Sequence, residues 1–297
     1  LRQYSGRTNL YVPFRDAKRY LSGINISYHP KWVEGLFFGF SYVNQQYLED
    51  AQESGDMLAA LTDIFRRSEG IDDRIRPDRY ASLSMRWVWR EAQAEVYFEG
   101  GKNKFQTFKE FIMVPEKDAA IVLGVTKLFN LSRLDNFLEV GMELTKLAQT
   151  KDYSLAELNS WYIDQNIRHG YTHNGQWIGA GIGPGSNLAT IDLSWLNTNH
   201  KLGLVLEREL HNSDFYYLAF EHNRDWNKYW IDYTIGIKGY TQMKDLMIQG
   251  RIVRINSLNY QWIHERAPED PYVGPGNDLV NWNFNLSLIY HLPTKDS

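Results

Sequence analysis

The sequence has no cysteine, few prolines and no long apolar run, and each absence excludes a class of protein. Without cysteine there is no disulfide, no thiolate metal ligand and no cysteine nucleophile. The longest stretch without a charged side chain runs from residue 169 to 191, but its richness in Gly, Asn and Thr rules out a membrane-spanning helix. Any passage through a membrane therefore requires a closed β-sheet, because only helices and barrels satisfy every backbone polar group in lipid.

An excess of basic charge is also missing. The chain carries 32 Lys and Arg against 36 Asp and Glu, a formal net charge of −4, and its basic residues form no run. Nucleic acid is therefore excluded as a partner, since phosphate binding needs a concentrated basic face. The mean hydropathy of −0.48 is compatible with a membrane barrel, because barrel strands place polar residues toward the lumen.

Aromatic residues, in contrast, make up 14% of the chain, and many lie in segments that alternate with a period of two. The clearest segment covers residues 280–292. Polar residues, interrupted only by Ile289, alternate with one apolar series, namely Val280, Trp282, Phe284, Leu286, Leu288, Tyr290 and Leu292. This pattern predicts a strand of about 13 residues with one apolar face.

Ten more segments show the same alternation, some less regularly: 24–28, 36–42, 81–90, 94–99, 119–129, 138–145, 189–195, 202–209, 229–238 and 246–262. About eleven strands are therefore expected. In the hairpin formed by 81–90 and 94–99, arginines of the first strand and glutamates of the second are predicted to face one another on the polar side.

Strand length decides between a membrane barrel and a soluble sheet. A transmembrane strand needs about 9–11 residues with aromatic residues near its ends, whereas soluble strands average about five or six. We predict an all-β fold, an antiparallel transmembrane β-barrel that forms one domain over residues 1–297 and lies in the bacterial outer membrane, in contact with its lipid. Helical patterns at 55–66 and after the capping pair Ser154 and Glu157, reaching Trp161 and Tyr162, predict short helices in loops or a plug.

The segment 168–187 (RHGYTHNGQWIGAGIGPGSN) is the most unusual in the chain, because six of its residues are glycine. It predicts a sharply folded loop leading into a strand near Asn187. The glycine spacing does not fit a dinucleotide or phosphate loop, and no lysine follows it. His169 and His173 have the spacing of helical zinc ligands, but Gly170 and Gly175 argue against a helix there. We expect neither a metal ion nor another cofactor.

Catalytic motifs give no clear signal. There is no G-x-S-x-G elbow, and the separation of paired carboxylates cannot be read from a sequence with so many Asp and Glu. The abundant Trp, Tyr, Asn, Gln and Arg side chains instead suit sugars, because aromatic faces stack on C–H surfaces and amides bind hydroxyls.

The segment 168–187 closely resembles the signature of the Wzi-type capsule-assembly proteins of the bacterial outer membrane. The motifs YHPKW at 28–32, GLFFG at 35–39 and NYQW at 259–262 are similar to the same family. The resemblance implies a barrel of about 18 strands, partly filled by helices, that acts as a lectin-like attachment factor for capsular polysaccharide without catalysis. Because family members are longer and eleven strands are too few, we expect an N-terminal part of the barrel to be missing from this chain.

Three functions are consistent with these patterns. The first is a non-enzymatic outer-membrane barrel that binds or organises cell-surface polysaccharide, alone or with other outer-membrane proteins. The second is a channel or transporter. This function is disfavoured by bulky side chains predicted to point into the lumen, namely Arg86, Arg90, Tyr97 and Trp230. The third is a barrel enzyme that acts on lipid or glycan. The glycine-rich segment supplies the candidate polysaccharide-binding residues, with a structural role as the alternative: Arg168, His169, Tyr171, His173, Asn174, Gln176 and Trp177.

Overall fold

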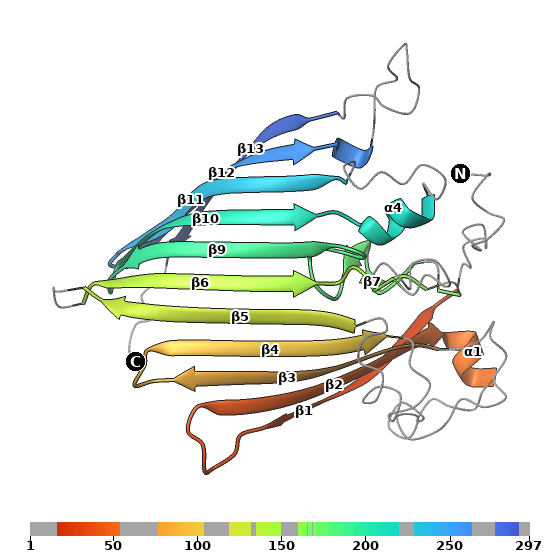
Figure 1. The fold of residues 1–297 in the computed structure, drawn as a ribbon. Coiled ribbons are helices and arrows are strands. Elements are labelled where there is room, and N and C mark those ends of the chain that lie inside the picture. The colour runs from red at the N-terminus through yellow and green to blue at the C-terminus, as the bar shows by residue number, and fades with distance from the viewer. Residues whose placement is uncertain are drawn as a thin grey trace.

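The chain forms one large antiparallel sheet in a computed structural model (Figure 1). The structure describes residues 17–53, 77–103, 119–131, 135–149, 160–164, 166–167, 169–219, 229–262 and 277–290. No helix within these ranges is long and apolar enough to cross a membrane.

The sheet contains eleven strands of 10 to 13 residues. They are β1 (Arg19–Tyr28), β2 (Leu36–Tyr47), β3 (Asp78–Trp89), β4 (Ala94–Asn103), β5 (Ala119–Asn130), β6 (Phe137–Lys146), β9 (Asn187–Leu196), β10 (His200–Leu210), β11 (Ile231–Met243), β12 (Leu246–Leu258) and β13 (Leu279–Tyr290). The smaller elements are a two-stranded hairpin, β7 (Thr172–His173) with β8 (Gln176–Trp177), the helices α1 (Leu48–Glu53) and α4 (Ser213–Ala219), and the 3-10 turn η3 (Tyr260–Trp262).

Every strand of the large sheet pairs with its neighbours in chain order, with β6 next to β9. The sheet is strongly curved, and β1 and β13 form its two edges (Figure 1). The predicted all-β, antiparallel architecture and the expected count of about eleven strands are thus confirmed for the described residues. The described strands do not close into a complete barrel, so the expected total of about 18 strands stays a prediction.

The connections differ sharply between the two ends of the strands. At the end near α4 they span from 15 residues (β4 to β5) to 40 residues (β6 to β9), and at the opposite end they span only 2 to 7 residues. We call these the long-connection end and the short-turn end. Short turns at one end and long loops at the other are typical of outer-membrane barrels.

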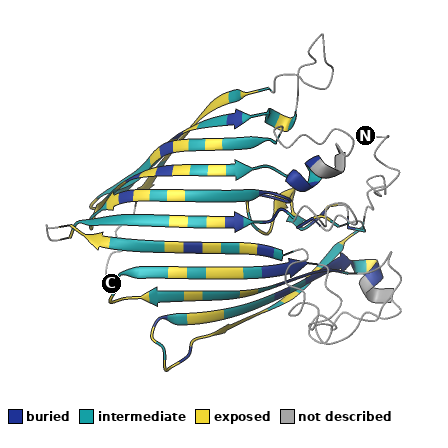
Figure 2. Ribbon diagram, in the orientation of Figure 1, coloured by how far each residue is buried: buried dark blue, intermediate teal, exposed yellow. Residues whose placement is uncertain are grey.

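The strand register aligns apolar residues into rows across one face, which we call the outward face. One row crosses six strands through a series of direct partners: Val140, Leu193, Leu204, Ile237, Ile252 and Phe284. These side chains are exposed or only half-buried. Figure 2 shows exposed residues recurring along the strands of the sheet. The alternation predicted from the sequence is therefore present, and it places a wide apolar surface on one side of the sheet.

The opposite, inward face carries charged pairs that join neighbouring or nearby strands. Arg86 of β3 forms an ion pair with Glu95 of β4 at 2.7 Å, which confirms the predicted contact across this hairpin. Three similar pairs link strands farther along the sheet: Lys201 with Glu139, Lys238 with Asp192, and Arg251 with Glu207. Several charges of the inward face are thus paired with one another.

Some predicted elements differ from the structure. The strand expected over 246–262 ends at Leu258, and the chain continues into η3. Trp161 and Tyr162 lie in a turn, where Tyr162 has a φ of 67°, so the predicted helix does not include them. Arg90, expected in the lumen, lies in the β3–β4 turn and pairs with Glu34 at 3.0 Å. The helix expected at 55–66 and the strand end beyond Tyr290 lie outside the described residues.

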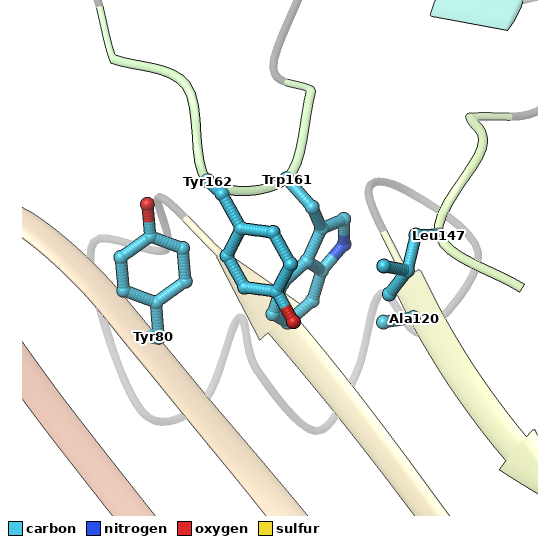
Figure 3. Close-up of a cluster of buried hydrophobic side chains, with 5 residues drawn as sticks. All are labelled: Tyr80, Ala120, Leu147, Trp161 and Tyr162. Atoms are coloured by element: carbon cyan, nitrogen blue, oxygen red, sulfur yellow. The ribbon is translucent and has the colours of Figure 1, made fainter. Parts of the chain in front are cut away.

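The buried side chains do not form a central core. Most of them lie at the long-connection end, in strand ends, α1, α4 and the loop after β6 (Figure 2). The larger cluster consists of Tyr80, Ala120, Leu147, Trp161 and Tyr162 (Figure 3). The sheet itself is a single layer, and the loops that pack on its inward face provide the burial.

Candidate binding site

An aromatic cluster on the inward face marks the candidate site. Tyr80 projects from the start of β3 toward Trp161 and Tyr162, which come from the loop after β6 (Figure 3). The ring centroid of Tyr80 lies 5.7 Å from that of Trp161, 6.1 Å from that of Tyr162 and 4.8 Å from that of Tyr171. These separations are in the range of favourable aromatic pairs. Four rings from three segments therefore form one packed group, which we call the aromatic cluster.

The glycine-rich segment folds around Tyr162. The Tyr171 amide donates to the Tyr162 carbonyl at 2.9 Å, and the Ala180 amide donates to the Tyr162 hydroxyl at the same distance. Gly179 permits this approach, since a Cβ there would lie 2.3 Å from the Tyr162 ring. Gly170 has a φ of +63°, a conformation that favours glycine. The glycines thus allow the chain to wrap closely around one buried tyrosine.

The hairpin of β7 and β8 projects beyond this wrapping. Asn174 and Gly175 form its turn with φ values of 47° and 78°, as a two-residue hairpin turn requires. Arg19 of β1 holds its base, because the guanidinium donates to the carbonyls of Gly170 at 2.8 Å and Thr172 at 2.7 Å. The loop is therefore tied to a strand about 150 residues away in sequence.

A cavity of about 370 Å³ lies beside the aromatic cluster, between the inward face of β2–β5 and the loop. Its aromatic lining comes from Tyr80, Trp161, Tyr162 and Tyr171, and its polar lining from Ser41, Ser82 and Glu99. Aromatic faces with a carboxylate and two hydroxyl groups match the two surfaces of a sugar ring, the C–H face and the hydroxyl edge. The volume is in the range of small-ligand pockets.

Burial of the phenols follows from this packing. It raises the pKa of the Tyr162 hydroxyl, although the hydrogen bond from the Ala180 amide opposes the shift. Burial also raises the pKa of Tyr171, and the Asp78 carboxylate adds to the effect. Both hydroxyls therefore stay protonated at neutral pH and can act as hydrogen-bond donors.

A search of protein-family models and of curated protein sequences finds no match to this chain. Among solved structures, the fold is similar to that of Wzi from Escherichia coli, described as an outer-membrane protein involved in group 1 capsule assembly and a carbohydrate-binding β-barrel. The TM-score is 0.57 with 10% sequence identity, over 80% of this chain and 48% of Wzi.

The likeness shows a shared fold. This chain spans about half the length of Wzi, in agreement with its open eleven-stranded sheet. The predicted Wzi-like barrel architecture is therefore supported by the structural comparison at the level of the fold.

The residues predicted to bind polysaccharide are only partly brought together. Tyr171 lines the cavity. Trp177 contacts Tyr162 at 6.1 Å between ring centroids but is not part of the lining. The remaining described candidates are exposed in or next to the hairpin, outside the cavity: His169, His173, Asn174 and Gln176. Arg168 lies outside the described residues. Within the described ranges, no group of three or more His, Asp or Glu is arranged to hold a metal ion.

Sequence reasoning missed most of the cavity. Tyr80 immediately precedes a recognised strand, and Glu99 lies at the end of another, so neither stands out locally. Trp161 and Tyr162 were predicted to lie on a helical stripe, and their convergence on Tyr80 is a long-range contact. Only the loop's return to the sheet brings these residues together.

A second aromatic group lies at the long-connection end of β10–β12. His211 stacks on Trp230 at 4.1 Å and pairs with Asp232 at 2.9 Å. Trp230, expected in the lumen, precedes β11 in a loop and packs edge-on against Trp262 and Tyr260. The family-like motif at 259–262 thus forms the rim of the sheet.

Proposed function

We propose that this chain is part of a Wzi-type outer-membrane barrel that binds cell-surface polysaccharide without catalysing a reaction. The observation that carries the proposal is the cavity in which Tyr80, Trp161, Tyr162 and Tyr171 meet Glu99 on the inward face. The fold shared with Wzi, described as a carbohydrate-binding β-barrel, supports the same conclusion.

The outward face supports the membrane location. Large apolar side chains in the middle strands are more than half exposed, among them Leu144 at 55%, Leu202 at 58% and Ile237 at 57%. Exposing such a surface to water costs a free energy of about 25 cal/mol per Å² of apolar area. Large contiguous exposed apolar patches mark contacts with a membrane or another protein. Lipid is a suitable environment for an apolar band that crosses every strand.

Aromatic residues border this band. On β13, Trp282 and Tyr290 lie eight residues apart on the outward face. Eight residues extend about 27 Å along a strand, which corresponds to about 21 Å along the membrane normal at a tilt of about 40°. This span fits the outward apolar band of about 25 Å with aromatic girdles that outer-membrane barrels possess. The long-connection end then faces the cell exterior, and the cavity opens near it.

The cavity is suited to one or two sugar units of a longer chain. Its aromatic walls are held by packing against Gly101 and Gly179, which leave no room for side chains at these positions. Such prearranged walls lose little conformational freedom on binding. A repeating polysaccharide offers many identical units, so moderate affinity at one site can retain a long polymer.

Purified full-length protein tests the binding site, with oligosaccharides from the cell's own capsule as the probe. Replacing Tyr171 by Ala should weaken binding by at least about 5-fold, because a lost aromatic stack is worth about 1 kcal/mol. Glu99→Gln should also weaken it, whereas Gln242→Ala, in β11 at the short-turn end, is the matched control. Heat-modifiable gel mobility verifies that each variant is folded. Equal affinity of all four proteins would show that the cavity is not the site.

Two further measurements test location and the absence of catalysis. The protein should fractionate with the outer membrane, and recovery in the soluble fraction would contradict the proposal. Labelled capsule and lipopolysaccharide should be recovered intact after incubation with the protein. Any product above that of a heat-inactivated sample would identify an enzyme instead.

A further inference from the structure

Two arginines interrupt the apolar outward face of β9–β13. Arg208 of β10 and Arg254 of β12 both have exposed side chains at outward positions. No other Lys, Arg, Asp or Glu occupies an outward position on these five described strands. A charge that faces lipid is costly, so its position and its partner need a physical reason.

Their register places the two arginines at the head-group level, not in the middle of the band. Arg208 lies directly opposite Tyr233, and Arg254 lies directly opposite Trp282. Tyr and Trp at outward positions near strand ends mark the membrane interface. Both arginines therefore lie in the girdle at the long-connection end, which the proposed orientation places in the outer leaflet.

The same register brings the two side chains toward one another. Tyr233 pairs with Arg208 on one side and with Asn256 on the other, and Arg254 is two residues from Asn256 on the same face. The Cα atoms of Arg208 and Arg254 are separated by two strand spacings and by two residues along the strand, which together give about 12 Å. Two long guanidinium side chains can span this distance from both sides of a single anionic group.

A shallow groove of about 470 Å³ lies between them. Its lining combines polar and apolar groups, including Leu206, Arg208, Tyr233, Ile235, Arg254 and Asn256. Arg208, Tyr233 and Asn256 form the row nearer the exterior, and Leu206, Ile235 and Arg254 form the next row toward the membrane centre. Each of these rows thus carries one arginine, and the next row toward the membrane centre is wholly apolar, with Leu204, Ile237 and Ile252.

These arginines differ from those on the inward face. There Arg251 binds both carboxylate oxygens of Glu207 at 3.1 Å, and Arg86 pairs with Glu95. Within the described part of the chain, no carboxylate lies within ion-pair distance of Arg208 or Arg254. Their charge is therefore available to an external anion, and the planar guanidinium binds phosphate in a bidentate manner.

We propose that Arg208 and Arg254, with Asn256 and Tyr233, bind the phosphate of a phosphorylated glycolipid in the outer leaflet. The acyl chains of this lipid lie along Leu206 and Ile235. The inference rests on the proposed outer-membrane location but does not depend on polysaccharide binding in the inward cavity. Each barrel would carry a bound lipid at a defined position on its outer wall.

Native mass spectrometry of the full-length protein in detergent tests the site, with lipid A as the probe. The double variant Arg208→Ala with Arg254→Ala should lower the retention of lipid A at least 10-fold. Arg251→Ala, on the inward face of the same strand, is the matched control and should retain it. Dephosphorylated lipid A should bind weakly to all three proteins, and phosphatidylglycerol more weakly than lipid A to the unaltered protein.

Retention of lipid A by the double variant within 2-fold of the unaltered protein would overturn the proposal. Equal binding of lipid A and its dephosphorylated form would do the same, and equal binding of phosphatidylglycerol would overturn the choice of glycolipid. Membrane fractionation of the same cells separates two kinds of failure. Protein absent from the outer membrane refutes the proposed function, whereas correctly located protein without phosphate-dependent binding refutes only this site.

Discussion

The outward face of β13 provides a direct test of the membrane assignment. Leu286 is 72% exposed and lies four residues from Trp282 and four from Tyr290. Four residues correspond to about 14 Å of strand, or about 10 Å along the membrane normal at a tilt of about 40°. Leu286 is therefore near the midplane, where an arginine facing lipid costs about 2–4 kcal/mol. Leu286→Arg should lower the folding equilibrium constant by about 30-fold to about 1000-fold.

The neighbouring residue supplies the control. Ser287 lies on the inward face of the same strand, directly opposite the uncharged Gln249, so Ser287→Arg adds the same side chain without exposing it to lipid. Folding into phospholipid vesicles, followed by heat-modifiable gel mobility over a urea series, measures both variants. Ser287→Arg should stay within about 1 kcal/mol of the unaltered protein. If the two variants lose equal stability, the assignment of the lipid-facing side is wrong.

Two further predictions concern the loop around Tyr162. Gly179→Val should destabilise the loop by about 1–3 kcal/mol, because a Cβ at this position would lie 2.3 Å from the Tyr162 ring. Gly181→Val is the control, since a Cβ there would meet no atom within 4 Å. Equal melting curves of the two variants would contradict the packing. Burial raises the pKa of Tyr162 and Tyr171 above the usual 10.0. The protonated phenols therefore contribute their full stabilisation of the folded state below pH 10, and this contribution declines as the pH rises through the folded-state pKa. Phenolate absorbance of the folded protein should therefore lose only intensity that appears above pH 10 in a Tyr162→Phe, Tyr171→Phe variant. Loss of a component near pH 10 would refute the burial.

The sheet could be predicted from the sequence because its signal is local. Each strand carries its own alternation, so the faces of β6, β9 and β13 follow from adjacent residues without knowledge of partners. The ion pair of Arg86 with Glu95 was predictable for the same reason, since a short turn fixes the register of a hairpin and places the two residues diagonally on one face.

The cavity could not be predicted, because its residues meet only through long-range contacts. Periodicity placed Trp161 and Tyr162 on a helix, but the positive φ of Tyr162 and its contact with Gly179 override that local preference. The glycine-rich segment was correctly recognised as a folded loop before β9. Its polar candidates, such as His173 and Gln176, are displayed on a hairpin outside the cavity, and whether they contact polysaccharide stays a prediction.

The contact of Arg19 with the loop has a consequence for the order of folding. Its guanidinium reaches the carbonyls of Gly170 and Thr172 across 151 and 153 residues of sequence, so the entropy of closing that long segment must be overcome before either bond forms. Neighbouring hairpins, with turns as short as two residues, form without this cost. The loop therefore acquires its final shape only after β1 has joined the sheet. During assembly the strands can therefore pair while the cavity beside Tyr162 is still incomplete, and the proposed binding of polysaccharide would have to wait for this long-range contact.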